Sequence, residues 1–336
     1  MPTDDLAESI DRIAADNQFS GVVRVDIDNA VAFERAYGFA NRAYAVPNAV
    51  DSQFGLASGT KGLTALTVVS LIETGHLDLA TTARSILNDD LPLIDDAVTI
   101  EQLLAHRSGI GDYFDEETSG EIDEYVISAP VHELRTTEAY VPILDGYAQK
   151  FAPGERFSYC NGGYVVLALL AERAAGTSFY DLVAQRVCQP AGMRDTDFLR
   201  SDELPGRAAV GYLTAEGQRT NGLHLAVRGS GDGGIFSTAA DLHALWHAFF
   251  DGRIVSPRWV AEMTRARSDV PEEQARYGLG FWLDPVNTAV RLEGYDAGVS
   301  MRTVHDPSRN VTFTVLSNTS PGAWPVARYL ASVTVA

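Results

Sequence analysis

The sequence predicts an α+β protein: an antiparallel sheet built from both ends of the chain and flanked by helices, beside a mostly helical lobe. Strand-like segments occur between residues 21 and 37 and again between residues 278 and 316. Short helical patterns separated by Pro, Gly and Asp fill residues 76–224. We therefore expect an α/β sheet lobe from residues 1–75 and 225–336, a helical lobe from residues 76–224 inserted between them, and a site in the cleft.

The N-terminal segment is predicted to form a helix, a hairpin and a second helix. Residues 4–16 have an amphipathic pattern with an acidic first turn, which suits the helix dipole. Residues 21–27 alternate as a strand does, and a turn leads into a partner strand at residues 31–37. Apolar residues recur at helical spacing from residue 63 to residue 72.

The middle of the chain carries clear helix boundaries. Thr99 and Gln102 have the spacing of a capping box. Residues 162–175 form an apolar run that Gly176 is placed to end. Residues 111–125 form an acidic loop, which is either a solvated surface loop or a lid over a site. Tyr113, near its start, is a candidate substrate contact.

The C-terminal third is predicted to return to the sheet. The glycine-rich residues 229–234 lack the flanking pattern of a phosphate cradle and are interpreted as a close-packed loop. A helix is expected over residues 238–250, where His243 and His247 are four residues apart. Such a pair can bind zinc, but packing against neighbouring apolar residues is the preferred interpretation. Strands are expected at residues 278–283, 289–292, 299–305 and 311–316, followed by a helix at residues 324–332.

The composition disfavours several classes of partner. The formal net charge is −19 over 336 residues, which argues against nucleic acid or an anionic membrane surface, since both need a basic patch. Cys160 and Cys188 are too few for a disulfide scaffold and have no metal-binding spacing. No run of about 18 apolar residues indicates a membrane span, and the acidic N-terminus shows no signal-peptide pattern. We therefore expect a cytoplasmic protein.

Ser58 and Lys61 form the pattern Ser-x-x-Lys where the second helix is predicted to begin. Residues three apart lie on the same helical face, so the two side chains can touch. A serine hydroxyl becomes a good nucleophile when a neighbouring base takes its proton. Burial favours the neutral form of lysine, which can then act as that base. Alone, the pattern is weakly specific and also fits a helix start with a solvated lysine.

Four stretches, in order, resemble motifs of the serine β-lactamase and penicillin-binding protein superfamily, in its class C β-lactamase, D-aminopeptidase and family VIII esterase branch. Residues 58–61 read Ser-Gly-Thr-Lys and are similar to its Ser-x-x-Lys motif. Residues 103–110 resemble its LLxHxSGL loop, residues 151–161 its PGxxFxYSN stretch, and residues 233–242 its GGLxSTAxDL stretch. The resemblance implies a β-lactamase/transpeptidase-like fold.

The resemblance also implies roles. Ser58 would be the acylated nucleophile, and Lys61 and Tyr159 would share the proton transfers. A phenol has a reference pKa of about 10, so Tyr159 is expected to need a cation such as Lys61 beside it. Asn161 would orient Lys61 and the substrate. Amide groups at the helix start near Ser58 suit a developing oxyanion, and a second donor would come from a strand.

The strand that supplies this donor differs from the family pattern. One register places residues 292–294, Leu-Glu-Gly, at the third family motif, with the N–H of Tyr295 as donor. Another places residues 296–298 there, with Val299 as donor. Neither register contains the basic residue found in relatives. In the first, Leu292 would form an apolar wall, and Leu292, Gly294 and Tyr295 are candidate substrate contacts, although Leu292 and Glu293 face opposite ways and only one can line the cleft.

These features predict a serine hydrolase that acts through an acyl-enzyme on a small ester or amide, without a metal or organic cofactor. Esterase activity is preferred over β-lactamase activity, because β-lactams and D-alanyl peptides carry a carboxylate that an acidic strand would repel. β-Lactamase or D-amino-acid peptidase activity is the first alternative. The second is a family member that binds a ligand without turnover.

Overall fold

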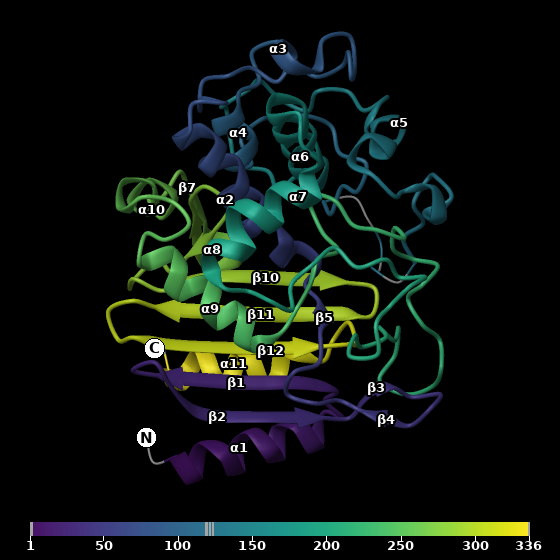
Figure 1. The fold of residues 1–336 in the computed structure, drawn as a ribbon, viewed down its shortest axis with the longest axis vertical. Coiled ribbons are helices and arrows are strands. Elements are labelled where there is room, and N and C mark those ends of the chain that lie inside the picture. Colours follow the sequence, from purple (N-terminus) through teal and green to yellow (C-terminus); the bar gives the residue numbers. More distant parts are fainter. Residues whose placement is uncertain (1–2, 118–119, 121, 123, 335–336) are drawn as a thin grey trace.

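The computed structural model, which describes residues 3–117, 120, 122 and 124–334, contains an antiparallel sheet with helices on both faces (Figure 1). Among these residues the sheet has eight strands in the order β2-β1-β12-β11-β10-β9-β8-β7. Its strands are β1 Gly21–Ile27, β2 Ala30–Tyr37, β7 Ser268–Val270, β8 Ala275–Tyr277, β9 Trp282–Leu283, β10 Val290–Asp296, β11 Val299–Asp306 and β12 Val311–Ser317. Because β1 pairs with β12, the two ends of the chain meet in one sheet. The predicted fold class is confirmed.

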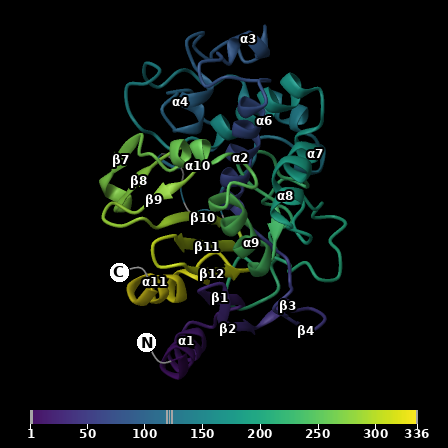
Figure 2. The same cartoon turned by 60° about the vertical axis from the view of Figure 1, so that its left-hand side comes forward.

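Short ribbons and helices complete the fold. The ribbons are β3 Phe39–Asn41 with β4 Val46–Pro47, and β5 Phe54–Gly55 with β6 Phe236–Ser237. The helices are α1 Thr3–Asp16, α2 Thr60–Glu73, α3 Arg84–Leu87, α4 Ile100–Leu104, α5 Val141–Leu144, α6 Asn161–Ala175, α7 Phe179–Val183, α8 Gln189–Ala191, α9 Ala239–Phe250, α10 Pro257–Met263 and α11 Ala323–Thr334. Figure 2 shows α1 and α11 on one side of the sheet and α9 on the other.

The two faces of the sheet bury different cores, because alternate residues of a strand point to opposite sides. Phe313 and Val315 on β12 pack with α1 and α11, whereas Leu316 belongs to the larger core with α2, α6 and α9. This larger core joins residues of both predicted lobes. The lobe boundaries therefore remain a prediction. Helix α2 is buried almost all round, and half-buried Ser58 lies in the turn directly before its first residue.

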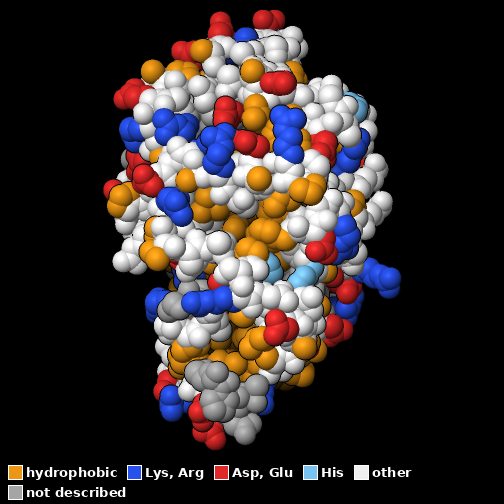
Figure 3. All heavy atoms as spheres, turned by 90° about the vertical axis from the view of Figure 1, so that its left-hand side faces the viewer, with side chains coloured by type: hydrophobic (Ala, Val, Ile, Leu, Met, Phe, Trp, Pro, Cys, Tyr) orange, Lys and Arg blue, Asp and Glu red, His pale blue; other side chains and the backbone are white. Residues whose placement is uncertain are grey.

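Most local predictions match the observed elements. The Thr99–Gln102 capping box is present, and Gly176 ends α6 with a φ of 63°. Strands β7 and β8 were missed, since each has three residues and too few positions for a period of two to be visible. On the face in Figure 3, acidic and basic side chains are interspersed. No described helix combines the length and apolar character needed to cross a bilayer.

The histidines of α9 take part in packing and ion pairing. His243 Nδ1 lies 3.2 Å from Asp26 Oδ2, and the His247 ring packs against the rings of His243 and His305. Among the described residues, no three His, Cys, Asp or Glu side chains are grouped as metal ligands. Packing was the preferred interpretation of the pair.

Buried His305 should make the fold sensitive to acid. Burial lowers its pKa from 6.5 to about 4, and its Nδ1 lies 2.8 Å from Thr312 Oγ1. Because the folded-state pKa is depressed, this contribution is present above pH 6.5 and is lost as the pH falls toward 4. Over that range the wild type should lose up to about 3 kcal/mol more stability than His305→Gln. Urea unfolding across the range measures both; parallel losses would contradict the assignment.

Candidate active site

Ser58 lies in a tight turn between strand β5 and helix α2. The turn is the 3₁₀ element η1, Ala57–Gly59. Ala57 has a φ of 43°, in the left-handed region that side chains rarely adopt, so the turn holds backbone strain beside the serine. Leu56 N donates to Ile235 O at 2.8 Å and anchors the turn on the neighbouring loop. The serine is therefore held by a rigid scaffold.

Lys61 is buried next to this serine. Its Nζ lies 2.9 Å from Ser58 Oγ, 2.8 Å from Asn161 Oδ1 and 2.8 Å from the carbonyl oxygen of Asp232. The amide and carbonyl oxygens can only accept hydrogen bonds. Lys61 Nζ also donates to Ser58 Oγ. Once Lys61 has released one proton, its two remaining N–H groups stay on the two acceptor-only oxygens and its lone pair faces Ser58 Oγ. This geometry suits removal of the serine proton.

The side-chain amide of Asn161 is oriented by two acceptors. Its Nδ2 donates to Phe114 O at 2.9 Å and to Glu116 Oε1 at 2.9 Å. Both partners only accept, so Oδ1 must face Lys61. The expected contact between Asn161 and Lys61 is present, whereas contact of Asn161 with a substrate stays a prediction.

Asp112 positions the start of α6 and was missed at the sequence level. Its carboxylate accepts from Asn161 N at 2.6 Å and from Gly162 N at 2.8 Å. Burial raises its pKa to about 6, although these hydrogen bonds act in the opposite direction. A single Asp in an acidic loop gives no local signal of a partner about 50 residues away.

Tyr159 lies two residues before Asn161, with its hydroxyl at Ser58. Burial and the negative charge of Glu116 raise its pKa well above the ordinary value, and the hydrogen bond with Ser58 only partly offsets this. The expected cation is in place, with Lys61 Nζ 5.0 Å from the centre of the Tyr159 ring, but burial and Glu116 dominate and keep the pKa of the phenol raised. Tyr159 is a protonated phenol at rest, which suits a proton donor.

The C-terminal part of β10, beyond its pairing with β9 at Val290 and Arg291, lies directly against the serine turn. A Cβ on Gly294 would stand 1.9 Å from Leu56 O, so only glycine allows this approach. The hairpin between β10 and β11 pairs Asp296 with Val299. Amide directions alternate along an antiparallel strand, so the N–H of Tyr295 points away from β11, toward the serine turn. This favours the register with Tyr295 as the second oxyanion donor.

Leu292 does not line the cleft, contrary to the expected apolar wall. It is 2% exposed, and a Cβ on Gly62 would stand 2.5 Å from its Cδ2. The side chain therefore packs beneath α2. Glu293 faces the other way and pairs with Arg291 and with Arg302, the latter at 3.2 Å.

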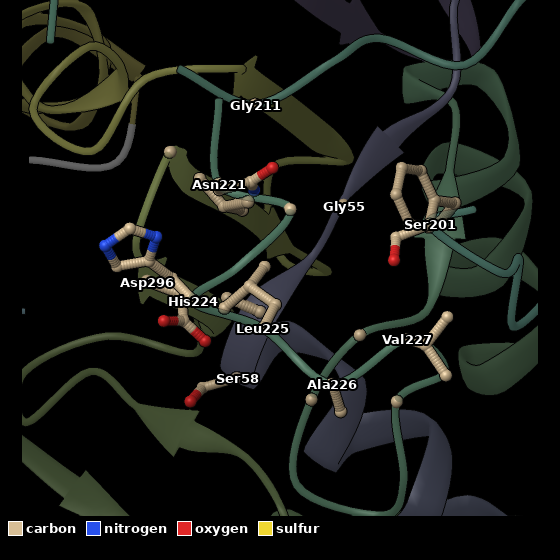
Figure 4. A pocket seen from close by; sticks show the side chains of 18 of the residues that line it. Gly55, Ser58, Ser201, Gly211, Asn221, His224, Leu225, Ala226, Val227 and Asp296 are labelled. Carbon is tan, nitrogen blue, oxygen red and sulfur yellow. The ribbon is translucent and has the colours of Figure 1, made fainter. Parts of the chain in front are cut away.

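Hollows on two sides of Ser58 are lined by described residues. The first, of about 200 Å³, also opens to Asp296 and is walled by apolar side chains such as Leu225 and Val227 (Figure 4). The second, of about 640 Å³, contains Tyr159 and several aromatic rings. Its charged lining residues are Glu116, Glu117, Glu272, Glu273, Glu293 and Arg156. The serine therefore faces an apolar space on one side and an acidic space on the other.

The described part of the acidic loop borders these hollows. Tyr113 donates its hydroxyl to Asp232 Oδ2 at 2.5 Å and lines the first hollow. Glu116 and Glu117 line the second hollow, whereas Asp115 pairs with Lys150 at 2.7 Å. Residues 118, 119, 121 and 123 lie outside the described part of the chain. This arrangement favours a wall of the cleft over a plain surface loop.

A serine beside a buried lysine, a protonated tyrosine and converging backbone donors is the arrangement of an acyl-transferring serine hydrolase. The chain belongs to the Beta-lactamase family, whose model matches residues 6–335. Members of this family are serine hydrolases.

Relatives in the family have different activities. Penicillin-binding protein 4* of Bacillus subtilis is 28% identical over 84% of this chain and 63% of its own length. D-aminopeptidase of Brucella anthropi is 28% identical over 69% and 42%, and esterase EstB of Burkholderia gladioli is 34% identical over 54% and 47%. This chain therefore spans about two thirds or less of these relatives. The crystal structure of a penicillin-binding protein from Bacillus halodurans has a TM-score of 0.90 at 32% identity, covering 96% of this chain and 99% of that one.

Proposed function

We propose that the protein hydrolyses small esters or amides without a negative charge, through an acyl-enzyme on Ser58, and acts as an esterase rather than as a β-lactamase. The observation that supports this most is the lining of the second hollow. Among the described residues that form it, five are Glu and one is Arg; Glu293 is paired with two arginines, whereas Glu272 and Glu273 have no ion-pair partner there. Such a lining disfavours a substrate carboxylate, and β10 offers no lysine or histidine to hold one.

In the proposed acylation, Ser58 Oγ bonds to the substrate carbonyl carbon and its proton passes to Lys61. The amides of Ser58 and Tyr295 stabilise the oxyanion. The bond from the carbonyl carbon to the leaving group breaks, and Tyr159 gives that group a proton, which Lys61 replaces. Water then attacks the carbonyl carbon of the ester on Ser58 and gives a proton to Tyr159 and Lys61. These residues return a proton to Ser58 Oγ as its bond to the acyl group breaks, and the acid is released.

The two hollows suggest which side holds each part of the substrate. Ser58 lines both, whereas Tyr159 lines only the second. A proton donor must lie within hydrogen-bond reach of the group it protonates. We therefore assign the leaving group to the second hollow and the acyl group to the first, whose apolar walls suit a short hydrocarbon chain.

A substrate panel tests the proposed function. The panel contains p-nitrophenyl butyrate, the β-lactam nitrocefin, and the p-nitroanilides of D- and L-alanine. We expect Ser58-dependent turnover to be highest on the neutral ester. Preferred turnover of nitrocefin would reject the esterase assignment, and preference for a D-amino-acid amide would favour the peptidase alternative. An inert protein whose Ser58 no fluorophosphonate labels would favour ligand binding without turnover.

Removing negative charge from the second hollow should weaken the preference of the protein for neutral over anionic esters. Glu272 and Glu273 line it and have no ion-pair partner among the described residues. Their double replacement by Gln should raise kcat/KM for 4-acetoxybenzoate relative to 4-acetoxybenzamide by about two- to fivefold, since exposed charges each contribute less than about 1 kcal/mol. Glu8→Gln, on α1, is the control: it removes one negative charge from the protein surface far from the hollow and should leave the ratio of the two esters unchanged. Equal changes on both esters would place the leaving group elsewhere.

A further inference from the structure

His106 is a buried histidine next to Tyr159 that the proposed chemistry does not use. It follows α4, is 1% exposed and has a φ of 53°. Non-glycine residues adopt this left-handed conformation uncommonly, and Asn and His do so more readily than most. The surrounding structure therefore holds the residue in an unusual conformation directly beside the proposed proton donor.

Hydrogen bonds from His106 fix the backbone on either side of the tyrosine. Its carbonyl oxygen accepts from Ser158 N at 2.9 Å. Its ring Nδ1 accepts from Cys160 N at 3.1 Å. The His106 ring also packs on the Tyr159 ring, with centroids 4.3 Å apart and planes inclined by 32°. One residue thus contacts both flanking amides and the aromatic ring of Tyr159.

These contacts define the protonation state of the imidazole. Because Nδ1 accepts from a backbone amide, the ring proton must be on Nε2. Nε2 is buried without a hydrogen-bond partner among the described residues. The centre of the imidazole ring lies 4.9 Å from the ring centres of both Tyr164 and Tyr277. Burial and the charge of Lys61 lower the pKa of His106 well below its ordinary value. The residue is therefore neutral and can donate no proton to the substrate.

We propose that His106 is a positioning residue, which holds the Tyr159 hydroxyl at Ser58 while adding no charge beside Lys61. The inference rests on the proposed function, in which Tyr159 transfers the proton. Its physical basis is that a displacement of about 1 Å can cost about a hundredfold in rate. Two flanking hydrogen bonds and a ring contact leave the tyrosine little freedom to move.

The variant His106→Asn tests the contribution of the imidazole ring separately from that of the hydrogen bonds to Ser158 N and Cys160 N. Asn tolerates the left-handed conformation, and its Oδ1 can accept from Cys160 N in place of Nδ1, whereas the ring is lost. We expect kcat for an alkyl ester to fall by about 10- to 100-fold with KM little changed. In a Tyr159→Phe background the same change should cost less than about threefold, because the hydroxyl being positioned is absent.

The comparison between backgrounds decides the inference. An equal loss in both, or no loss in the wild-type background, would show that His106 only stabilises the fold. Ser58→Ala is assayed separately: turnover that survives it rejects the proposed function. NMR of the wild-type imidazole tests the inference without variants or activity. An unprotonated Nδ1 and a protonated Nε2 from about pH 5 to about pH 8 support it, and a titration midpoint above about 6 would overturn it.

Discussion

Ser58→Ala should reduce ester turnover on the order of 10⁴-fold or more and abolish labelling by a fluorophosphonate. The variant removes the atom that forms the acyl bond, and no neighbouring group can replace it. The hydroxyl contacts Lys61 Nζ at 2.9 Å, and losing this one hydrogen bond should change the fold little. Mass spectrometry of the labelled wild type should locate the adduct on the peptide that contains Ser58.

Ser332→Ala, on the exposed side of α11, is the matched control and should retain full labelling. Turnover in Ser58→Ala within about tenfold of the wild type would show that Ser58 is not the nucleophile, because removing a nucleophilic hydroxyl costs far more in rate. An adduct on a different serine would do the same.

The sequence predicted the parts of this molecule that depend on local patterns. Alternating residues defined β1 and β2, and the Ser-x-x-Lys spacing placed Ser58 and Lys61 at the same helix start. Contact between these two side chains follows from helical geometry alone. The 2.9 Å between Lys61 Nζ and Ser58 Oγ is a hydrogen-bond distance, which neighbours on one face of a helical turn can reach.

The supporting contacts of the site could not be predicted in the same way. The carbonyl of Asp232 is 171 residues from Lys61 along the chain, and Asp112 is 49 residues from Asn161. Both contacts depend on how loops pack against each other, and the local periodicity of hydrophobic residues carries no information about that packing. The signal closest to a prediction was the glycine-rich stretch around Asp232, which was interpreted as close-packed. A Cβ on Gly231 would indeed stand 2.1 Å from Tyr164 O.

The expected role of Leu292 illustrates a further limit. The alternation of a strand shows that Leu292 and Glu293 face opposite ways, but not which face is the cleft. Which face lines the cleft depends on where α2 packs. Helix α2 covers Leu292, and the absence of a side chain at Gly62 leaves room for the leucine. A lysine at position 292 would therefore bury its charge beneath the helix and destabilise the fold instead of reaching a substrate carboxylate.

Tyr159→Phe should reduce turnover by roughly 10²–10⁴-fold, the usual range for the loss of a general acid or base. The phenyl ring keeps its stacking with Trp282, where the centroids are 6.1 Å apart and the planes are inclined by 11°. Only the hydroxyl and its hydrogen bond with Ser58 are lost. The free energy of unfolding, measured by thermal denaturation, should therefore change by about 1 kcal/mol or less, the usual contribution of one hydrogen bond.

The size of this loss should depend on the leaving group, because the raised pKa makes Tyr159 a proton donor at rest. An alkyl alcohol needs that proton as it leaves, whereas p-nitrophenolate does not. We expect the loss to approach about 10⁴-fold for an alkyl butyrate and to stay near 10²-fold for p-nitrophenyl butyrate. Steady-state kcat/KM on both esters measures the difference, with exposed Tyr44→Phe as the control. Rates within about threefold of the wild type on both esters would assign Tyr159 to packing alone, since removal of a proton-transferring group costs more.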